Sequence, residues 1–98
     1  MSKTLVIFRK YSSGDIIAIF PHLPSSNSEH ECLSYSIFGD RGGHYLSADP
    51  LLYRALDAAS PAEYADLARE LTKLGYNLKI GKRVPQNSLE IRRKSLKR

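Results

Sequence analysis

The chain has 98 residues and a formal net charge of +5 at pH 7. This length suffices for one compact domain and is too short for two. Hydrophobic residues make up 42% of the sequence and charged residues 26%, a composition that is typical of globular proteins. No apolar run approaches the roughly 18 residues that a membrane-spanning helix needs, so the sequence excludes a transmembrane protein.

The amino-terminal residues and the single cysteine bear on localisation. The first residues run directly into a strand-like segment, without the apolar stretch of a secretory signal peptide. Cys32 is the only cysteine and has no partner for an internal disulfide, which suits a reducing compartment. We therefore expect a cytoplasmic protein that does not engage a membrane.

Two short apolar runs predict a β-hairpin near the amino terminus. Residues 5–8 and 15–20 are rich in β-branched and aromatic residues, and a turn cluster of serine and glycine lies between them. Pro21 is expected to end the second strand, and the polar residues 21–30 are expected to form a loop.

Residues 31–38 alternate in polarity, which predicts a third strand followed by a glycine-rich turn over residues 39–44. Residues 45–59 leave two alternatives open, a short helix that starts at Asp49 and Pro50 or an irregular or extended segment. One face of the third strand is expected to carry Cys32, Ser34, Ser36 and Phe38, and the other Leu33, Tyr35 and Ile37.

The clearest predicted element is a helix over residues 61–74. Ser60 and Glu63 have the spacing of a capping box, with proline at the first helical position. Gly75 stands where a helix end favours a left-handed residue, and Tyr76 is placed for the hydrophobic contact that accompanies it. Apolar residues recur on one stripe of the helix, at Tyr64, Leu67, Ala68, Leu71 and Leu74.

The order strand, strand, strand, helix, strand predicts an α+β fold. Alternation over residues 76–84 indicates the fourth strand, which Pro85 ends. We expect a small antiparallel sheet of about four strands packed on one main helix, in a single domain of residues 1–84. Residues 85–98 form a basic tail, flexible or a short helix when docked, because its only residues to bury are Leu89, Ile91 and Leu96.

Positive charge is concentrated at the carboxyl end. Residues 82–98 hold seven basic residues against one glutamate, a net charge of +6, while residues 1–81 hold eight basic and nine acidic residues. A basic segment on a nearly neutral body predicts a polyanionic partner, either nucleic acid or a nucleoprotein. The alternative is a solvated tail that only aids solubility.

The predicted binding residues supply cations and one aromatic ring. Lysine and arginine neutralise phosphates, and a tyrosine on an open sheet face can stack on a base. The sequence has no RNP-like motif and no helix-turn-helix, so it favours phosphate-dominated binding over sequence-specific reading. The candidates for nucleic-acid or partner contact are Arg9, Lys10, Tyr35, Lys79, Lys82, Arg83, Arg92, Arg93, Lys94, Lys97 and Arg98.

Residues with catalytic or metal-binding potential are few. His22, His30, Cys32 and His44 lack the recurrent spacing of zinc ligands, and we interpret them as loop histidines and a small buried thiol. Cys32 lies in a predicted strand beside an acidic residue, a setting that does not favour the thiolate of a nucleophile. We therefore expect no enzyme activity, no cofactor and no metal.

A set of motifs spread over about residues 5–83 carries a family resemblance. The motifs are FRK at 8–10, GDIIAIFP at 14–21, CLSY at 32–35, PAEY at 61–64 and GYNL at 75–78. Together they resemble a family of small bacterial proteins that prophages, plasmids and other mobile elements often carry. That family commonly has a Gly-Gln-His-Gly-type turn after the third strand, where this chain has residues 39–44. The resemblance implies an accessory protein of a mobile element and supplies no defined catalytic residue.

Two functional interpretations follow. The leading one is a non-catalytic accessory protein of a mobile element that contacts nucleic acid or a nucleoprotein through its basic carboxyl-terminal segment. The alternative is an inhibitor of a host defence complex, similar to an anti-CRISPR protein, that acts by protein–protein contact. Either protein can be a monomer or a homodimer, because an unpaired strand edge can join two copies.

Overall fold

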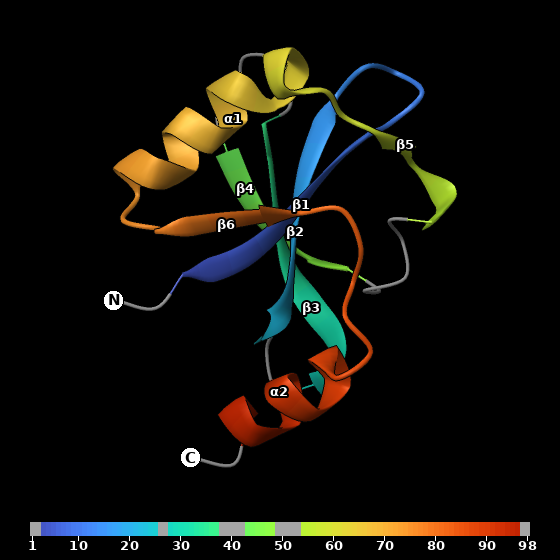
Figure 1. The fold of residues 1–98 in the computed structure, drawn as a ribbon, viewed down its shortest axis with the longest axis vertical. Helices are drawn as coiled ribbons and strands as arrows, with labels where there is room; N and C mark the ends of the chain where they lie inside the picture. Colours follow the sequence, from blue (N-terminus) through green and yellow to red (C-terminus); the bar gives the residue numbers. More distant parts are fainter. Residues whose placement is uncertain (1–2, 26–27, 38–42, 49–53, 97–98) are drawn as a thin grey trace.

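The computed structural model describes residues 3–25, 28–37, 43–48 and 54–96, of which residues 28–30, 37, 43–44 and 46–48 are described by their backbone alone. Within these residues six strands and two helices follow one another (Figure 1). Their bounds are Thr4–Lys10 for β1, Ile16–Ser25 for β2, Ser28–Ile37 for β3, Gly43–Ala48 for β4, Asp57–Ala58 for β5, Pro61–Lys73 for α1, Leu78–Gly81 for β6 and Ser88–Leu96 for α2.

β1 and β2 form the predicted hairpin. Ile7 pairs with Ile19 in antiparallel register. In the connecting turn the Tyr11 amide donates to the Asp15 carbonyl at 2.9 Å, and Gly14 takes a positive φ of 96°, which glycine adopts without steric cost. The structure therefore confirms the hairpin and its turn.

β2 does not stop at Pro21, so the predicted loop over residues 21–30 is wrong. The strand continues to Ser25 and stays paired with β3. The pairing register shifts between Phe20 and Pro24. Prolines fit at such irregularities, because the ladder of hydrogen bonds is locally interrupted there.

β3 confirms the predicted alternation, since Cys32 contributes to one hydrophobic cluster and Leu33 and Tyr35 to another. β4 pairs antiparallel with β3, and its later residues fall in the segment for which the sequence left two alternatives open. Most of the predicted glycine-rich turn, and the possible helix start at residues 49–53, lie outside the described residues.

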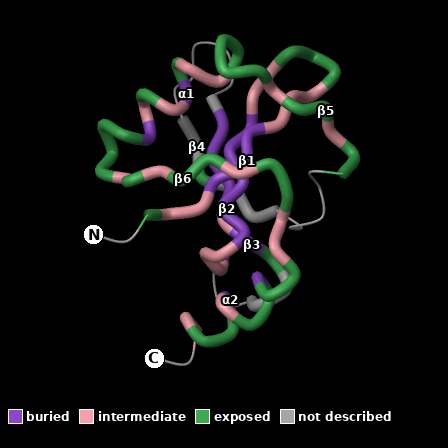
Figure 2. Tube along the Cα trace, in the orientation of Figure 1, coloured by how far each residue is buried: buried purple, intermediate pink, exposed green. Residues whose placement is uncertain are grey.

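The sheet is buried on both faces, and buried residues gather along β1, β2 and β3 (Figure 2). This explains why neither β1 nor β2 alternates cleanly in sequence, because a strand covered on both sides is apolar throughout. The first cluster holds Val6, Phe8, Ala18, Phe20, Tyr35, Leu67 and Leu71. The second holds Ile7, Ile17, Ile19 and Cys32.

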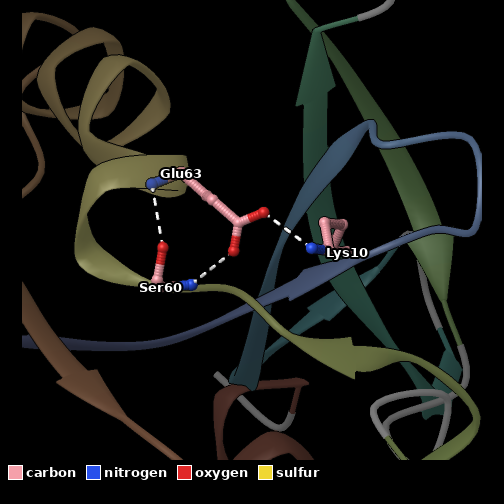
Figure 3. Close-up of polar contacts among 3 residues, drawn as sticks. All are labelled: Lys10, Ser60 and Glu63. Carbon is pink, nitrogen blue, oxygen red and sulfur yellow. Dashed lines mark hydrogen bonds and ion pairs between the residues drawn. The ribbon is translucent and has the colours of Figure 1, made fainter.

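α1 begins with the predicted capping box (Figure 3). The Glu63 amide donates to the Ser60 hydroxyl at 3.3 Å, and the Ser60 amide donates to the Glu63 carboxylate at 2.9 Å. These bonds satisfy amides that the first helical turn would otherwise leave without a partner. The helix therefore starts where the local sequence specifies.

α1 also ends as its sequence predicts. Gly75 has a φ of 109°, and the Tyr76 amide donates to the Leu71 carbonyl at 3.2 Å, which is the pattern of a Schellman ending. Leu71 is fully buried. Leu74, predicted on the same stripe, is instead 51% exposed, because it is already the cap residue that follows the last helical turn.

β5 and β6 share one edge of β1, so the sheet forks there. β2 occupies the other edge of β1, while β6 lies along residues 4–7 and β5 lies beside residues 9–10. β6 runs parallel to β1, which corrects the all-antiparallel prediction: α1 crosses over the sheet between β5 and β6 and returns the chain in the direction of β1. The α+β class, with a small sheet packed on a helix, is confirmed.

The carboxyl-terminal segment forms α2, which packs on β2 and β3. The sequence predicted a flexible tail over residues 85–98, or a short helix when docked, whereas residues 88–96 form a helix that packs on the chain's own sheet. Figure 1 shows α1 and α2 at opposite ends of the sheet. The buried residues of α2 are Ser88 and Arg92 rather than the expected apolar ones, and Leu89 is 36% exposed. The Arg92 Nη1 donates to the Pro21 carbonyl at 2.5 Å, so a buried polar contact anchors the helix.

Candidate functional site

Exposed cations run from β6 through the following loop to α2. In Figure 1 this stretch, coloured orange to red, passes from the forked edge of the sheet to the helix at the opposite end. We call residues 79–94 the cationic segment. Its exposed cations are Lys79, Lys82, Arg83, Arg93 and Lys94.

Contacts with other elements fix the path of the cationic segment. Arg9 donates from Nη2 to the Lys82 carbonyl at 2.6 Å, which ties the loop to β1. Burial lowers the pKa of the His22 imidazole, and the positive charges of Arg92 and Lys79 lower it further. The cationic segment is therefore tied to β1 near its start and to β2 through α2 near its end.

Little negative charge offsets the cationic segment. Glu90 is its only acidic residue. The two ion pairs of α1, Lys10 with Glu63 and Arg69 with Asp66, lie outside the segment. Four of its cations form no ion pair with any carboxylate of the described residues, namely Lys79, Lys82, Arg83 and Lys94. The predicted contacts Lys97 and Arg98 lie outside the described residues.

Two predicted contact residues stabilise the fold instead of facing a partner. Lys10 Nζ lies 2.7 Å from the Glu63 Oε2 (Figure 3). That hydrogen bond, together with those from Ser60, lowers the pKa of Glu63 to about 2. Arg92 is only 4% exposed, because its guanidinium anchors α2. We therefore remove both residues from the candidate interface.

Tyr35 does not lie on an open sheet face, so its predicted role in stacking on a base does not fit the structure. Tyr35 is 5% exposed, and its ring packs edge-to-face against that of Tyr45, with centroids 4.8 Å apart. Burial raises the pKa of the Tyr35 phenol, and the charge of Glu70 raises it further. Tyr45 is 48% exposed, and its hydroxyl lies 2.9 Å from that of Tyr76.

A pocket of about 590 Å³ opens at the fork of the sheet. The rings of Phe8 and Tyr64 stack beside it, with centroids 4.4 Å apart and an interplanar angle of 11°. Nothing in the sequence indicates this pocket, because it exists only where β5 and β6 diverge from the same strand. Its lining residues are Phe8, Arg9, Ala58, Ala59, Pro61, Tyr64, Ile80, Gly81 and Lys82.

The residues considered for metal binding do not form a cluster in the described part of the chain. Cys32 is fully buried among isoleucines, and His22 is half-buried on β2. The side chains of His30 and His44 lie outside the described residues. Within the described ranges, no three histidine, cysteine or acidic side chains are arranged to hold a metal ion.

Neither of the two described helices is long and apolar enough to cross a membrane. No protein-family model matches the chain, and no curated protein and no solved structure matches it significantly. The family resemblance therefore rests on sequence motifs alone.

Proposed function

We propose that this protein binds the phosphate backbone of a nucleic acid through the cationic segment, as a non-catalytic accessory protein of a mobile element. One observation carries the proposal: five exposed cations follow one another along residues 79–94, with a single acidic residue among them. The motif resemblance supports the mobile-element context.

The arrangement favours phosphate contact because the cations are held on folded elements. Lys79 belongs to β6, Lys82 is tied to β1 through its carbonyl, and Arg93 and Lys94 belong to a docked helix. Side chains presented from ordered backbone lose less conformational entropy on binding than those of a free tail. The segment is therefore partly preorganised for an extended polyanion.

Binding of this kind depends strongly on salt. Each phosphate that a cation neutralises releases condensed counterions, which gives a slope of log K against log salt of about −0.9 per contact on a duplex. If all five exposed cations contact phosphates, the slope is about −4.5. Such binding reads backbone charge and carries no base sequence information by itself.

The test measures the affinity of labelled single-stranded and double-stranded oligonucleotides for the intact chain at several salt concentrations. Two double variants, Lys82→Ala with Arg83→Ala and Arg93→Ala with Lys94→Ala, each remove two exposed cations. We expect each to lower the affinity by roughly tenfold or more and to reduce the salt slope by about 2. The matched control, Arg69→Ala with Lys73→Ala, removes the same charge from α1 and is expected to change the affinity little.

Two outcomes contradict the proposal: no binding of any oligonucleotide at ~50 mM salt, where phosphate contacts are strong, or an equal loss in the α1 control. The alternative function, an inhibitor of a host defence complex, predicts a different result. Such an inhibitor binds a defence protein directly and leaves free oligonucleotides unbound.

A further inference from the structure

We propose that the pocket at the fork of the sheet receives one unpaired nucleotide of the strand that the cationic segment binds. The base lies against the apolar lining, and the adjoining phosphate lies at Lys82. This inference rests on the proposed function and deepens it, because it makes single-stranded nucleic acid the preferred partner.

The size and the lining of the pocket suit a base. Its volume of about 590 Å³ lies within the range of small-molecule sites in proteins, roughly 300–1,000 Å³. Apart from two cations, the lining consists of alanine, proline, glycine, isoleucine and the stacked rings of Phe8 and Tyr64. Tyr64 is only half-buried, so part of its side chain stays accessible to an occupant. A flat aromatic occupant gains contact area on such a surface.

The charge of the lining selects an occupant that also carries an anion. Among the residues that the structure describes, Arg9 and Lys82 are the charged residues of the lining, which includes no carboxylate. The hydrogen bond from Arg9 to the Lys82 carbonyl places the Arg9 guanidinium beside the backbone of Lys82 at the fork. An aromatic plane beside a phosphate is the chemistry of a nucleotide.

The pocket is continuous with the cationic segment. Lys82 belongs to both, and Arg83 follows it in the chain. Ile80, which lines the pocket from β6, is 49% exposed and so lies near its opening. A nucleic-acid backbone that runs along the cationic segment therefore passes the pocket. A base held in a duplex cannot leave its stack without a cost of a few kcal/mol, whereas an unpaired base enters freely.

The decisive experiment compares two single strands with the same phosphates, an oligothymidylate and an abasic strand of equal length. We expect the strand with bases to bind roughly tenfold tighter, which is the effect of stacking one base on an aromatic surface. Ala58→Ile fills the pocket from β5, at an exposed position where a β-branched residue suits the strand. This variant is expected to lose the difference between the two strands and to keep the affinity for the abasic strand.

The matched control is Ala55→Ile, which adds the same side chain at an exposed residue outside the pocket and should keep the tenfold preference. If Ala58→Ile lowers the melting temperature of the protein, Ile80→Thr makes the same comparison by replacing an apolar part of the lining with a hydroxyl. Free thymidine monophosphate, added as a competitor, tests whether the pocket takes a free nucleotide or a nucleotide within a strand. If the monophosphate competes only at concentrations far above the dissociation constant of the strand, the result supports a base that belongs to a strand.

Three results overturn the inference: equal affinity for the two strands, an equal loss of preference in the Ala55 control, or competition by the free monophosphate as strong as that of the strand. If the protein binds the two strands equally and the binding depends steeply on salt, the phosphate-binding function stands and only the proposed role of the pocket is contradicted. If the unmodified protein binds neither strand, the proposed function itself is contradicted.

Discussion

α1 and α2 both dock on the sheet, but different forces hold them. α1 buries Leu67 and Leu71 in the first hydrophobic cluster. α2 buries Ser88 and Arg92, and Arg92 donates a hydrogen bond to the carbonyl of a residue in β2. An apolar contact tolerates small shifts, whereas a buried guanidinium needs its acceptor in one place.

The two helices also differ in what the local sequence contributes. α1 has a capping box at its start and a left-handed glycine after its end. α2 has nine residues, and helices that short are not stable in water by themselves. α2 therefore depends on its contacts with β2 and β3, while α1 is specified both locally and by packing.

This difference bears on function, because the helix held by a polar contact is the one that carries exposed cations. The charge of α1 is largely balanced, and two of its acidic residues form ion pairs. α2 presents Arg93 and Lys94 while it uses Arg92 as an anchor. Three neighbouring basic residues thus have two roles, which their spacing in the sequence does not reveal.

Leu71→Ala is expected to have the largest effect, a loss of about 2–5 kcal/mol in the free energy of unfolding. Leu71 is fully buried, so its removal leaves a cavity between α1 and the sheet. Urea unfolding measures the loss. Leu74→Ala is the control, since Leu74 is 51% exposed at the end of the same helix and should change stability by less than about 0.5 kcal/mol. Equal losses in the two variants would show that α1 is not docked as described.

Arg92→Ala tests the polar anchor of α2 and is expected to cost about 1.5–3 kcal/mol, the contribution of a hydrogen bond to a charged group. Lys94→Ala removes the same charge from an exposed position of the same helix and should cost much less. Amide hydrogen exchange gives a second measurement: Arg92→Ala should raise exchange in residues 88–96 more than in residues 61–73. Unchanged protection of α2 in this variant would contradict the anchor.

Glu63→Gln is expected to have the smallest effect, and it should depend on pH. Contacts with Lys10 and Ser60 lower the pKa of Glu63 from its ordinary 4.5 to about 2. Because the folded-state pKa is the lower one, its charge stabilises the fold above about pH 4.5, and this contribution is lost as the pH falls through about 2. The melting temperatures of the variant and the unmodified protein should therefore differ at neutral pH and converge in acid.

A second variant separates the contact from the charge. Asp66→Asn removes an equal charge from α1, at a carboxylate that is 92% exposed, and should leave the melting temperature nearly unchanged. A difference between Glu63→Gln and the unmodified protein that persists below about pH 2 would mean that the Lys10 contact is not its source.

The sequence by itself determined the elements whose signals are local. The first hairpin follows from two apolar runs around a turn, and the alternation of β3 from its period of two residues. α1 follows from Ser60, Glu63 and Gly75, since caps act within a few residues of the chain. The excess of positive charge at the carboxyl end is likewise a property of composition alone.

Only the tertiary structure decided the features that join distant segments. β2 continues past Pro21 because β3 pairs with it across an irregular register, and β5 and β6 share an edge because α1 returns the chain parallel to β1. Arg92 is an anchor and not a surface cation because the Pro21 carbonyl lies opposite it. Each of these depends on pairing between residues far apart in the chain, and neither propensity nor periodicity encodes which distant groups will meet.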